Sequence, residues 1–260
     1  MNLWYRTEGV CMEFTDIHSH MLFGADDGPK TETEMYQMAQ AAYEDGIRTI
    51  CVTPHYHPGY FGNNISAIDR AFTLLERYMA QQYPCMQLFL GNELRYSQDC
   101  VSWLEEGYCR TMNQTRYVLI DFLEVESEKT IIAGIEKILN AGYIPILAHV
   151  ERYRSLGVSQ HRLKELHTNG VLIQVDAQSL FGGFGLSAKW KCKAILSQKL
   201  ADIVASDAHD LLKHPPALSK SYDYISRKYG SIYAENICHK NAWNLLHGNI
   251  INEEVKQHGE

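Results

Sequence analysis

Short apolar runs alternate along the chain with longer segments of helical periodicity. Seven of these runs have the length of a strand, are rich in β-branched residues and are nearly continuous in apolar character. Such runs are typical of strands that are buried on both faces of a parallel sheet. The seven runs are residues 14–18, 49–55, 87–94, 117–122, 144–150, 171–177 and 201–209.

The segments between and after these runs have the periodicity of helices and carry start and stop signals. Ser and Thr residues stand where a helix cap is expected, and Gly residues stand where the helices should end. The predicted helices run from Thr31 to Asp45 with a stop at Gly46, from Ser127 to Gly142, from Ser159 to near Gly170, over 217–229 and over 231–247.

The alternation of strand and helix predicts an α/β protein with one domain. No linker rich in Pro, Gly or Ser divides the chain, so we expect a distorted, TIM-like (β/α)7 barrel over residues 14–250. An open, doubly wound sheet is the competing architecture. Residues 1–13 lack the features of a signal peptide and are expected to form a disordered extension, with Met12 as an alternative start.

Composition excludes several classes of protein. The formal net charge of −7 disfavours binding to nucleic acid, and no apolar run approaches the roughly 20 residues that span a membrane. The seven cysteines are scattered and form no C-x-x-C pair, which argues against a disulfide framework and a zinc ribbon. The C-x5-R pattern of thiol phosphatases is absent as well. We therefore expect buried cysteines and a cytoplasmic protein.

Nearly every predicted strand ends in a side chain that is able to bind a metal. His18 and His20 are two residues apart, so in a strand their imidazoles point to the same side. A single histidine after a strand usually has a packing role, but a carboxylate at the end of an apolar strand is costly unless it is paired or coordinated. In a β/α barrel these strand ends meet at one mouth. The other candidates are His55, Glu93, Asp121, His149, Asp207 and His209.

This set of ligands narrows the choice of metal. Imidazole and carboxylate without thiolate suit manganese, iron or zinc. The set exceeds the needs of one ion, so we expect two or three ions with Glu93 or Asp121 between them. Metals a few ångströms apart are suited to phosphoryl transfer.

Other polar residues near the predicted mouth are ambiguous. Arg152 is placed to hold an anionic substrate, or to pair with Glu151 or another nearby acid. Lys213 and His214 add positive charge, while Asp176 is a weaker ligand candidate. His57 is expected to line the mouth. Surface or packing roles are expected for His161, His167, His239, His247 and His258.

Six motifs occur in an order that resembles a known family. They are DIHSH with DDG, TPH at 53–55, GNEL at 91–94, LIDF at 119–122, AHVERY at 148–153 and ASDAHD at 205–210. Together they resemble the polymerase and histidinol phosphatase (PHP) superfamily, and most closely its protein tyrosine phosphatases of bacterial capsule and exopolysaccharide synthesis. The similarity extends from Phe14 to Lys228.

The resemblance implies a distorted seven-stranded barrel that holds up to three ions, usually manganese. It implies that Asp27, in preference to Asp26, completes the ligand set, and that Arg152 holds the phosphate. It also implies a partner, a protein phosphotyrosine on a tyrosine autokinase that controls polysaccharide export. The implied ligands are His18, His20, Asp27, His55, Glu93, Asp121, His149, Asp207 and His209.

Two departures from the family pattern leave alternatives open. The carboxylate at Asp121 is usually Glu, and His214 stands where a second arginine is usual. Our hypothesis is hydrolysis by a metal-bridging hydroxide, with His55 or His209 as proton donor. The alternatives are a phosphatase or phosphodiesterase for small phosphoesters such as histidinol phosphate, and a binding module without activity. The stretches 57–64 and 179–186 are candidates for receiving an extended peptide.

Overall fold

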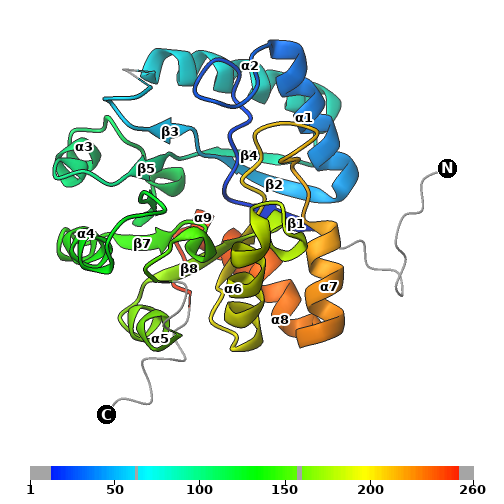
Figure 1. Cartoon of the computed structure of the whole chain (residues 1–260). Helices are drawn as coiled ribbons and strands as arrows, with labels where there is room; N and C mark the ends of the chain where they lie inside the picture. Colours follow the sequence, from blue (N-terminus) through cyan, green and yellow to red (C-terminus); the bar gives the residue numbers. More distant parts are fainter. Residues whose placement is uncertain (1–12, 62–63, 157–159, 252–260) are drawn as a thin grey trace.

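The computed structural model describes residues 13–61, 64–156 and 160–251 of the chain. Parallel strands form a curled sheet with helices packed around it (Figure 1). The strands in the described residues are β1 (Phe14–Asp16), β2 (Ile47–Val52), β3 (His55–Tyr56), β4 (Gln87–Leu90), β5 (Glu93–Arg95), β6 (Tyr117–Asp121), β7 (Ile144–Leu147), β8 (Leu172–Asp176) and β9 (Ile203–Ala205).

Most of the helices follow a strand and cover the outside of the sheet. The α-helices are α1 (Glu32–Asp45), α2 (Ile65–Gln82), α3 (Cys100–Glu105), α4 (Glu128–Asn140), α5 (Gln160–Thr168), α6 (Gly185–Ser197), α7 (Ser219–Tyr229), α8 (Ser231–Glu235) and α9 (Asn241–Leu246). Shorter helical turns are η1 (Met112–Gln114), η2 (Val150–Arg152), η3 (Gln178–Phe181) and η4 (Asn236–Lys240). None of the described helices is long and apolar enough to cross a membrane.

Local signals account for the ends of several helices. Thr31 caps α1 in a capping box with Glu34, and Gly46 closes that helix with a φ of 96°. The Ser127 side chain accepts a hydrogen bond from the backbone N–H three residues later and caps α4. The predicted cap at Ser159 lies outside the described residues. The predicted segment 231–247 is helical but is interrupted by the π-helical turn η4.

Two of the seven predicted runs are each divided into two strands. Run 49–55 becomes β2 and β3, because Pro54 has no N–H to donate to a neighbouring strand. Run 87–94 becomes β4 and β5 around Gly91, where an added Cβ would lie 3.0 Å from the Met112 sulfur. The order of pairing is β1-β2-β4 in one group and β3-β5-β6-β7-β8-β9 in the other.

Hydrogen bonds continue across these breaks and around the sheet. The N–H of Gly91, which lies between β4 and β5, donates to the carbonyl of Val52 at the end of β2. At the other edge, the His20 N–H donates to the Ala208 carbonyl over 2.8 Å, so that the first and last strand segments lie side by side. The sheet is therefore parallel and curled on itself, and the alternative of an open doubly wound sheet is not observed in the described residues.

The inward side of the sheet changes from apolar to polar along the strands. Leu119 of β6 belongs to a small apolar cluster inside the curl, and Asp121, two residues later, belongs to the polar end. Similarly, Ala205 of β9 is followed by Asp207. The period of two thus places apolar side chains at one end and ionisable side chains at the other.

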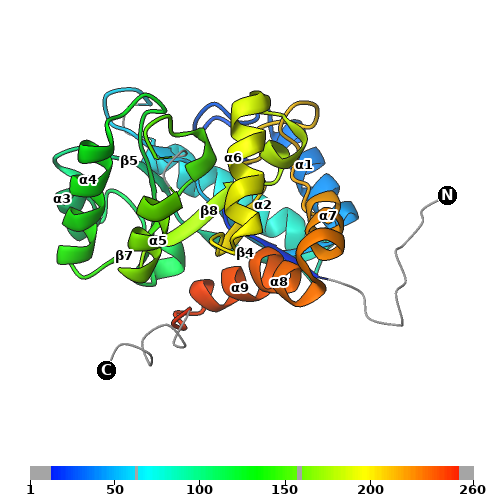
Figure 2. The same cartoon turned by 60° about the horizontal axis from the view of Figure 1, so that its bottom comes forward.

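The apolar end of the curled sheet is closed by the C-terminal helical segment. Ala242, Leu245 and Leu246 of α9 are buried in the same cluster as Ile146 and Leu172. Figure 2 shows α8 and α9 together at one end of the molecule. A larger core packs the outer helices against the opposite side of the strands.

The cysteines of the described residues are free thiols. Cys51, Cys100, Cys109, Cys192 and Cys238 are buried, as predicted. Cys85 is exposed, because it lies in the turn between α2 and β4. The prediction of a buried side chain is wrong at this position.

Candidate metal centre

The nine predicted ligands all come together at the polar end of the sheet. Six of them are buried, while Asp27, His55 and His209 form a more accessible rim. Three groups of ligand atoms lie within 4.8 Å of one another. The groups are His20 with Asp27, His55 and His209; His18 with His20 and Asp207; and Glu93 with Asp121 and His149.

Glu93 at the start of β5 lies at the centre of these groups. Its Oε1 is 3.0 Å from His149 Nε2 and 3.4 Å from His18 Nε2. Its Oε2 is 2.7 Å from His55 Nδ1 and 3.3 Å from His20 Nε2. The two carboxylate oxygens therefore face different sets of imidazoles, which is the arrangement of a bridging ligand.

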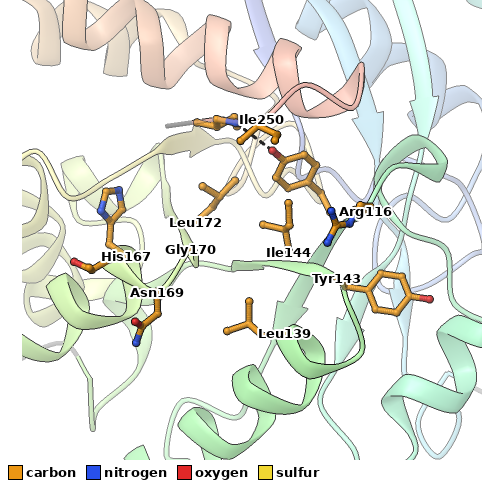
Figure 3. Close-up of a pocket in the computed structure, with 12 residues that line it drawn as sticks. Arg116, Leu139, Tyr143, Ile144, His167, Asn169, Gly170, Leu172 and Ile250 are labelled. Atoms are coloured by element: carbon orange, nitrogen blue, oxygen red, sulfur yellow. Dashed lines mark hydrogen bonds between the residues drawn. The ribbon is translucent and has the colours of Figure 1, made fainter. Parts of the chain in front are cut away.

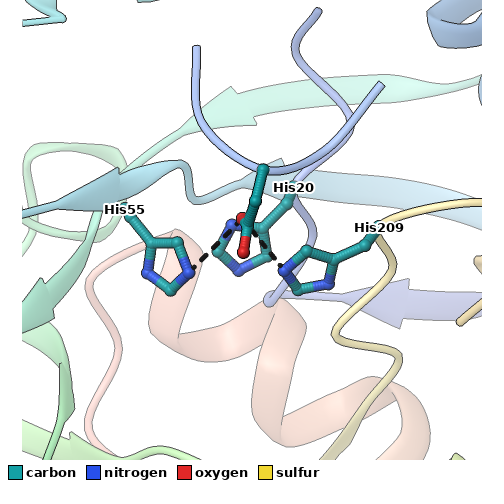
Figure 4. Close-up of side chains that lie close together, drawn as sticks. His20, His55 and His209 are labelled. Carbon is teal, nitrogen blue, oxygen red and sulfur yellow. Dashed lines mark ion pairs between the residues drawn. The ribbon is translucent and has the colours of Figure 1, made fainter. Parts of the chain in front are cut away.

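The DDG segment contributes two aspartates with different surroundings. Asp27 Oδ1 lies 3.6 Å from His55 Nε2 and 3.4 Å from His209 Nε2 at the rim (Figure 4). Asp26 is turned the other way, with Oδ2 2.7 Å from His20 Nδ1. The geometry thus places Asp27 among the candidate ligands and Asp26 behind one of them.

Hydrogen bonds behind the imidazoles fix which nitrogen faces the centre. The Nδ1 of His20 donates to the Asp26 carboxylate, and the Nδ1 of His18 donates to Gln174 Oε1 over 3.1 Å. The Nδ1 of His209 donates to the backbone carbonyl of Asp207 over 2.8 Å. Each Nε2 then keeps a lone pair that can bind a cation. Hydrogen bonds behind the ligands have the same orienting role in known metal sites.

The contacts at the centre fit bound cations. His18 Nε2 and His20 Nε2 are only 3.1 Å apart, and both are within 3.3 Å of Asp207 Oδ1. With both Nδ1 atoms protonated, two neutral imidazoles facing each other in this way have no proton to share. Either an additional proton or a cation is needed between them.

The same electrostatics shift the pKa values of the buried groups. Burial lowers the pKa of His18, but the charges of Asp207 and Glu93 outweigh it and raise the pKa to about 9. Burial alone would raise the pKa of Glu93, yet the neighbouring His18 and His55 hold it well below its usual range. The buried carboxylates therefore favour positive charge in the cluster, whether it is a proton on an imidazole or a cation between the ligands.

Unusual backbone conformations hold the site in place. His149 and Asp207 have positive φ values of 34° and 51°, which are uncommon outside glycine. Gly28 of the DDG segment packs so closely that an added Cβ would lie 1.8 Å from the His20 carbonyl oxygen. Strained or crowded backbone of this kind is concentrated at functional sites.

The chain matches the family described as "Capsular polysaccharide synthesis, CpsB/CapC" over residues 14–247. The chain belongs to this CpsB/CapC family. The tyrosine-protein phosphatase CpsB of Streptococcus agalactiae serotype III (strain NEM316) is 32% identical over 241 residues, which are 91% of this chain and 99% of the relative. The tyrosine-protein phosphatase YwqE of Bacillus subtilis (strain 168) is 29% identical over 216 residues, or 83% and 85% of the two chains.

A solved structure supports the same relationship. It comes from work on YwqE of Bacillus subtilis and CpsB of Streptococcus pneumoniae, described as unique metal-dependent tyrosine phosphatases. The TM-score is 0.82 at 29% identity, with 92% of this chain and 96% of the other covered. The resemblance inferred from the motifs is thereby confirmed.

In this CpsB/CapC chain, Arg152 of η2 lies at the edge of the centre. Its guanidinium pairs with Asp176 and Asp207, and not with the adjacent Glu151. The Arg152 guanidinium carbon lies over one face of the Phe184 ring, 3.5 Å from the ring centroid. His214 stacks on Phe184 with centroids 4.6 Å apart, and two groups this close to one ring cannot share a face. Phe184 is therefore held between Arg152 and His214.

The prediction from the sequence missed residues that hold the candidate ligands in place. Arg95 of β5 lies 2.7 Å from Asp121 Oδ2, which leaves Oδ1 directed toward His149. Gln174 of β8 accepts a hydrogen bond from the His149 backbone as well as from His18. For Arg95 the sequence did offer a signal, because it is two residues from Glu93 on the same strand.

The described histidines that were predicted to have surface or packing roles lie outside the centre. His167 contacts Asp202, His239 contacts Thr15 Oγ1, and His247 stacks on Trp243. His161 is exposed on α5, His57 stacks on Tyr60 next to the rim, and His258 lies outside the described residues.

A separate hollow of about 350 Å³ lies at the opposite, apolar end of the strands. Arg116, Ile144, Leu172 and Ile250 are among its lining residues (Figure 3). None of its described lining residues belongs to the nine candidate ligands, so it is not part of the candidate centre.

Proposed function

We propose that this chain is a metal-dependent protein-tyrosine phosphatase. The observation that carries the proposal is the convergence of five imidazoles and three further carboxylates around Glu93, with Arg152 at the edge. The relatives CpsB and YwqE support it, because both are named tyrosine-protein phosphatases. We further propose to count the curled sheet as a distorted barrel of seven strand segments, with β2–β3 and β4–β5 each as one segment.

We infer that the three ligand groups hold two or three ions, with manganese as the expected metal and iron or zinc as alternatives. When bound, such ions lower the pKa of water and neutralise charge on the phosphoryl oxygens. Glu93 holds the groups together, while Gln174 and Asp26 orient the imidazoles. Asp121 presents one oxygen to the centre, because Arg95 occupies the other.

The remaining steps belong to side chains of the mouth. Arg152 binds the phosphate through its guanidinium, which requires that it exchange part of its pairing with Asp176 and Asp207 for the substrate. A phenolate leaving group takes a proton from an imidazole at the rim that is protonated and not bound to an ion. His55 and His209 are the candidates, because their side chains are 13% and 20% exposed while the other three imidazoles are nearly closed off.

The expected substrate is a phosphotyrosine of a partner protein, a tyrosine autokinase of capsular or exopolysaccharide synthesis, in the cytoplasm. This expectation rests on the family to which the chain belongs. Histidinol phosphate and other small phosphoesters are the alternative substrates.

The test is the activity of metal-stripped protein that is titrated with manganese, iron or zinc. A phosphotyrosine peptide and histidinol phosphate should be compared side by side, in the wild type and in His149→Ala and Asp207→Asn variants. We expect manganese-dependent hydrolysis of the peptide and its loss in both variants, with the fold retained by circular dichroism. No turnover with any metal would favour a binding module, and faster turnover of histidinol phosphate would favour the small-substrate alternative.

A further inference from the structure

Positive charge is concentrated in one part of an acidic chain. Residues 185–230 contain eight Lys and Arg but only four Asp and no Glu, whereas the whole chain has 24 basic and 31 acidic residues. Two of these four acids, Asp202 and Asp207, are buried. The basic residues lie mainly on α6 and α7, which are neighbours in Figures 1 and 2.

A hollow of about 450 Å³ lies on this basic part of the surface. Lys220 Nζ is 4.2 Å from the centre of the Phe181 ring, and Lys228 Nζ is 3.2 Å from the Tyr224 hydroxyl. The only acid among its described lining residues is Asp223, at 3.6 Å from Arg227. The lining residues are Phe181, Lys220, Asp223, Tyr224, Arg227 and Lys228.

Tyr224 reports the local electrostatic potential. Burial would raise the pKa of its phenol, but Lys228 and Lys193 interact with the hydroxyl and lower the pKa below its ordinary value. A neutral phenol loses its proton more readily only where negative charge is stabilised. The hollow therefore favours an anion.

The hollow is connected to the mouth by a short stretch of chain. Phe181 lines the hollow, and Phe184, three residues later, contacts Arg152 at the candidate centre. A polypeptide with its phosphotyrosine at Arg152 can therefore pass along this stretch toward α7. Arg227 and Lys228 are exposed there, as is Lys220.

We propose that the basic surface of Phe181, Lys220, Tyr224, Arg227 and Lys228 binds acidic residues that adjoin the phosphotyrosine of the substrate protein. This inference rests on the proposed function, because it assigns the substrate's flanking sequence. Carboxylates would bind by charge complementarity, which affects the capture of a substrate more than its chemistry.

The test compares two synthetic phosphotyrosine peptides, one flanked by Glu and Asp and the other by Gln and Asn at the same positions. A Lys220→Glu/Lys228→Glu variant reverses charge on the basic surface. Its matched control is Lys129→Glu/Lys164→Glu, which makes the same change in net charge at exposed positions on α4 and α5. p-Nitrophenyl phosphate serves as a substrate that is too small to reach α7.

We expect the wild type to have a KM for the acidic peptide that is about fivefold lower than for the neutral one, with similar kcat, since each exposed ion pair contributes little. The α7 variant should lose this preference and the control should keep it. Raising the salt from about 50 to about 200 mM should weaken the preference in the wild type. Hydrolysis of p-nitrophenyl phosphate should change less than twofold.

Equal KM values for the two peptides in the wild type, or an equal loss of preference in both variants, would overturn the inference. Failure of the proposed function looks different, because the acidic phosphotyrosine peptide would then not be hydrolysed with any metal. In that case, fluorescence anisotropy of the labelled acidic peptide still tests the surface. Binding that is weakened by the α7 variant alone supports the surface, and binding unaffected by it refutes the surface.

Discussion

Replacing Asp26 by Asn should weaken metal binding although Asp26 is not itself a candidate ligand. Its Oδ2 accepts hydrogen bonds from His20 Nδ1 at 2.7 Å and from the His55 backbone at 2.9 Å, and its Oδ1 accepts one from Gly28 N at 3.0 Å. An Asn has one acceptor oxygen and one NH2 group. Either orientation of the amide therefore sets a donor against at least one N–H.

The structure indicates the size of this effect. If the amide oxygen stays with His20, the Gly28 N–H loses its partner, and a buried polar group without a partner costs about 1–3 kcal/mol. If the amide turns round, His20 must move its proton to Nε2, where it blocks the lone pair that faces the centre. Losses of about 10- to 100-fold in metal affinity are typical of such second-layer changes, which corresponds to roughly 1.4–2.8 kcal/mol.

The assay is calorimetric titration of the metal-stripped protein with manganese, together with 15N NMR of the histidine side chains to identify the His20 tautomer. Asp27→Asn is the matched comparison, because it changes a candidate ligand at the rim and leaves the partner of His20 in place. The reasoning is refuted if Asp26→Asn binds manganese as tightly as the wild type while His20 keeps its proton on Nδ1.

Three further predictions concern other parts of the chain. Phe184→Leu removes the ring beneath Arg152, and a contact of this kind is worth about 0.5–2 kcal/mol. The KM for a phosphotyrosine peptide should therefore rise by about 2- to 30-fold, with little change in kcat. The Phe184→Tyr variant keeps an aromatic ring there and should keep the wild-type KM. Gly28→Ala forces a Cβ against the His20 backbone carbonyl, so calorimetry should find a free energy of unfolding that is about 2 kcal/mol lower, and a lower Tm. An unchanged Tm would contradict the crowding at this position. The hydrogen bond to Asp202 raises the pKa of His167, so its stabilisation is present below the unfolded pKa of about 6.5 and is lost as the pH rises through the folded pKa. Urea unfolding of His167→Gln should therefore show a loss of less than about 1 kcal/mol near pH 6 and a smaller one near pH 9, and equal losses at both would contradict this assignment.

The sequence predicts the position of the centre because alternation in a strand is a local property. Leu119 and Asp121 lie on the same side of β6 two residues apart, so an apolar interior that ends in a carboxylate can be read directly from the chain. Once the fold brings the strand ends together, the ligands must meet. The motif order then distinguishes this family from other barrels.

The surroundings of the ligands are less predictable because they depend on distant segments. Asp26 and Asp27 are chemically the same and adjacent, and only the backbone path of the DDG segment decides which of them faces His209. The partners of Arg152 come from β8 and from the segment after β9, and Phe184 comes from the loop before α6. No spacing in the sequence identifies such contacts.

The stability of the site is supplied from outside it. Burying many ionisable groups is costly, and the positive φ values at His149 and Asp207 add strain. Neighbouring backbone contacts hold both residues in place, because His149 N donates to Gln174 Oε1 and Asp207 N donates to the His18 carbonyl. These two hydrogen bonds involve backbone atoms of the candidate ligands and not their side chains. Substituting a ligand side chain should therefore remove metal binding and leave the curled sheet folded on its apolar end, where α9 closes the core.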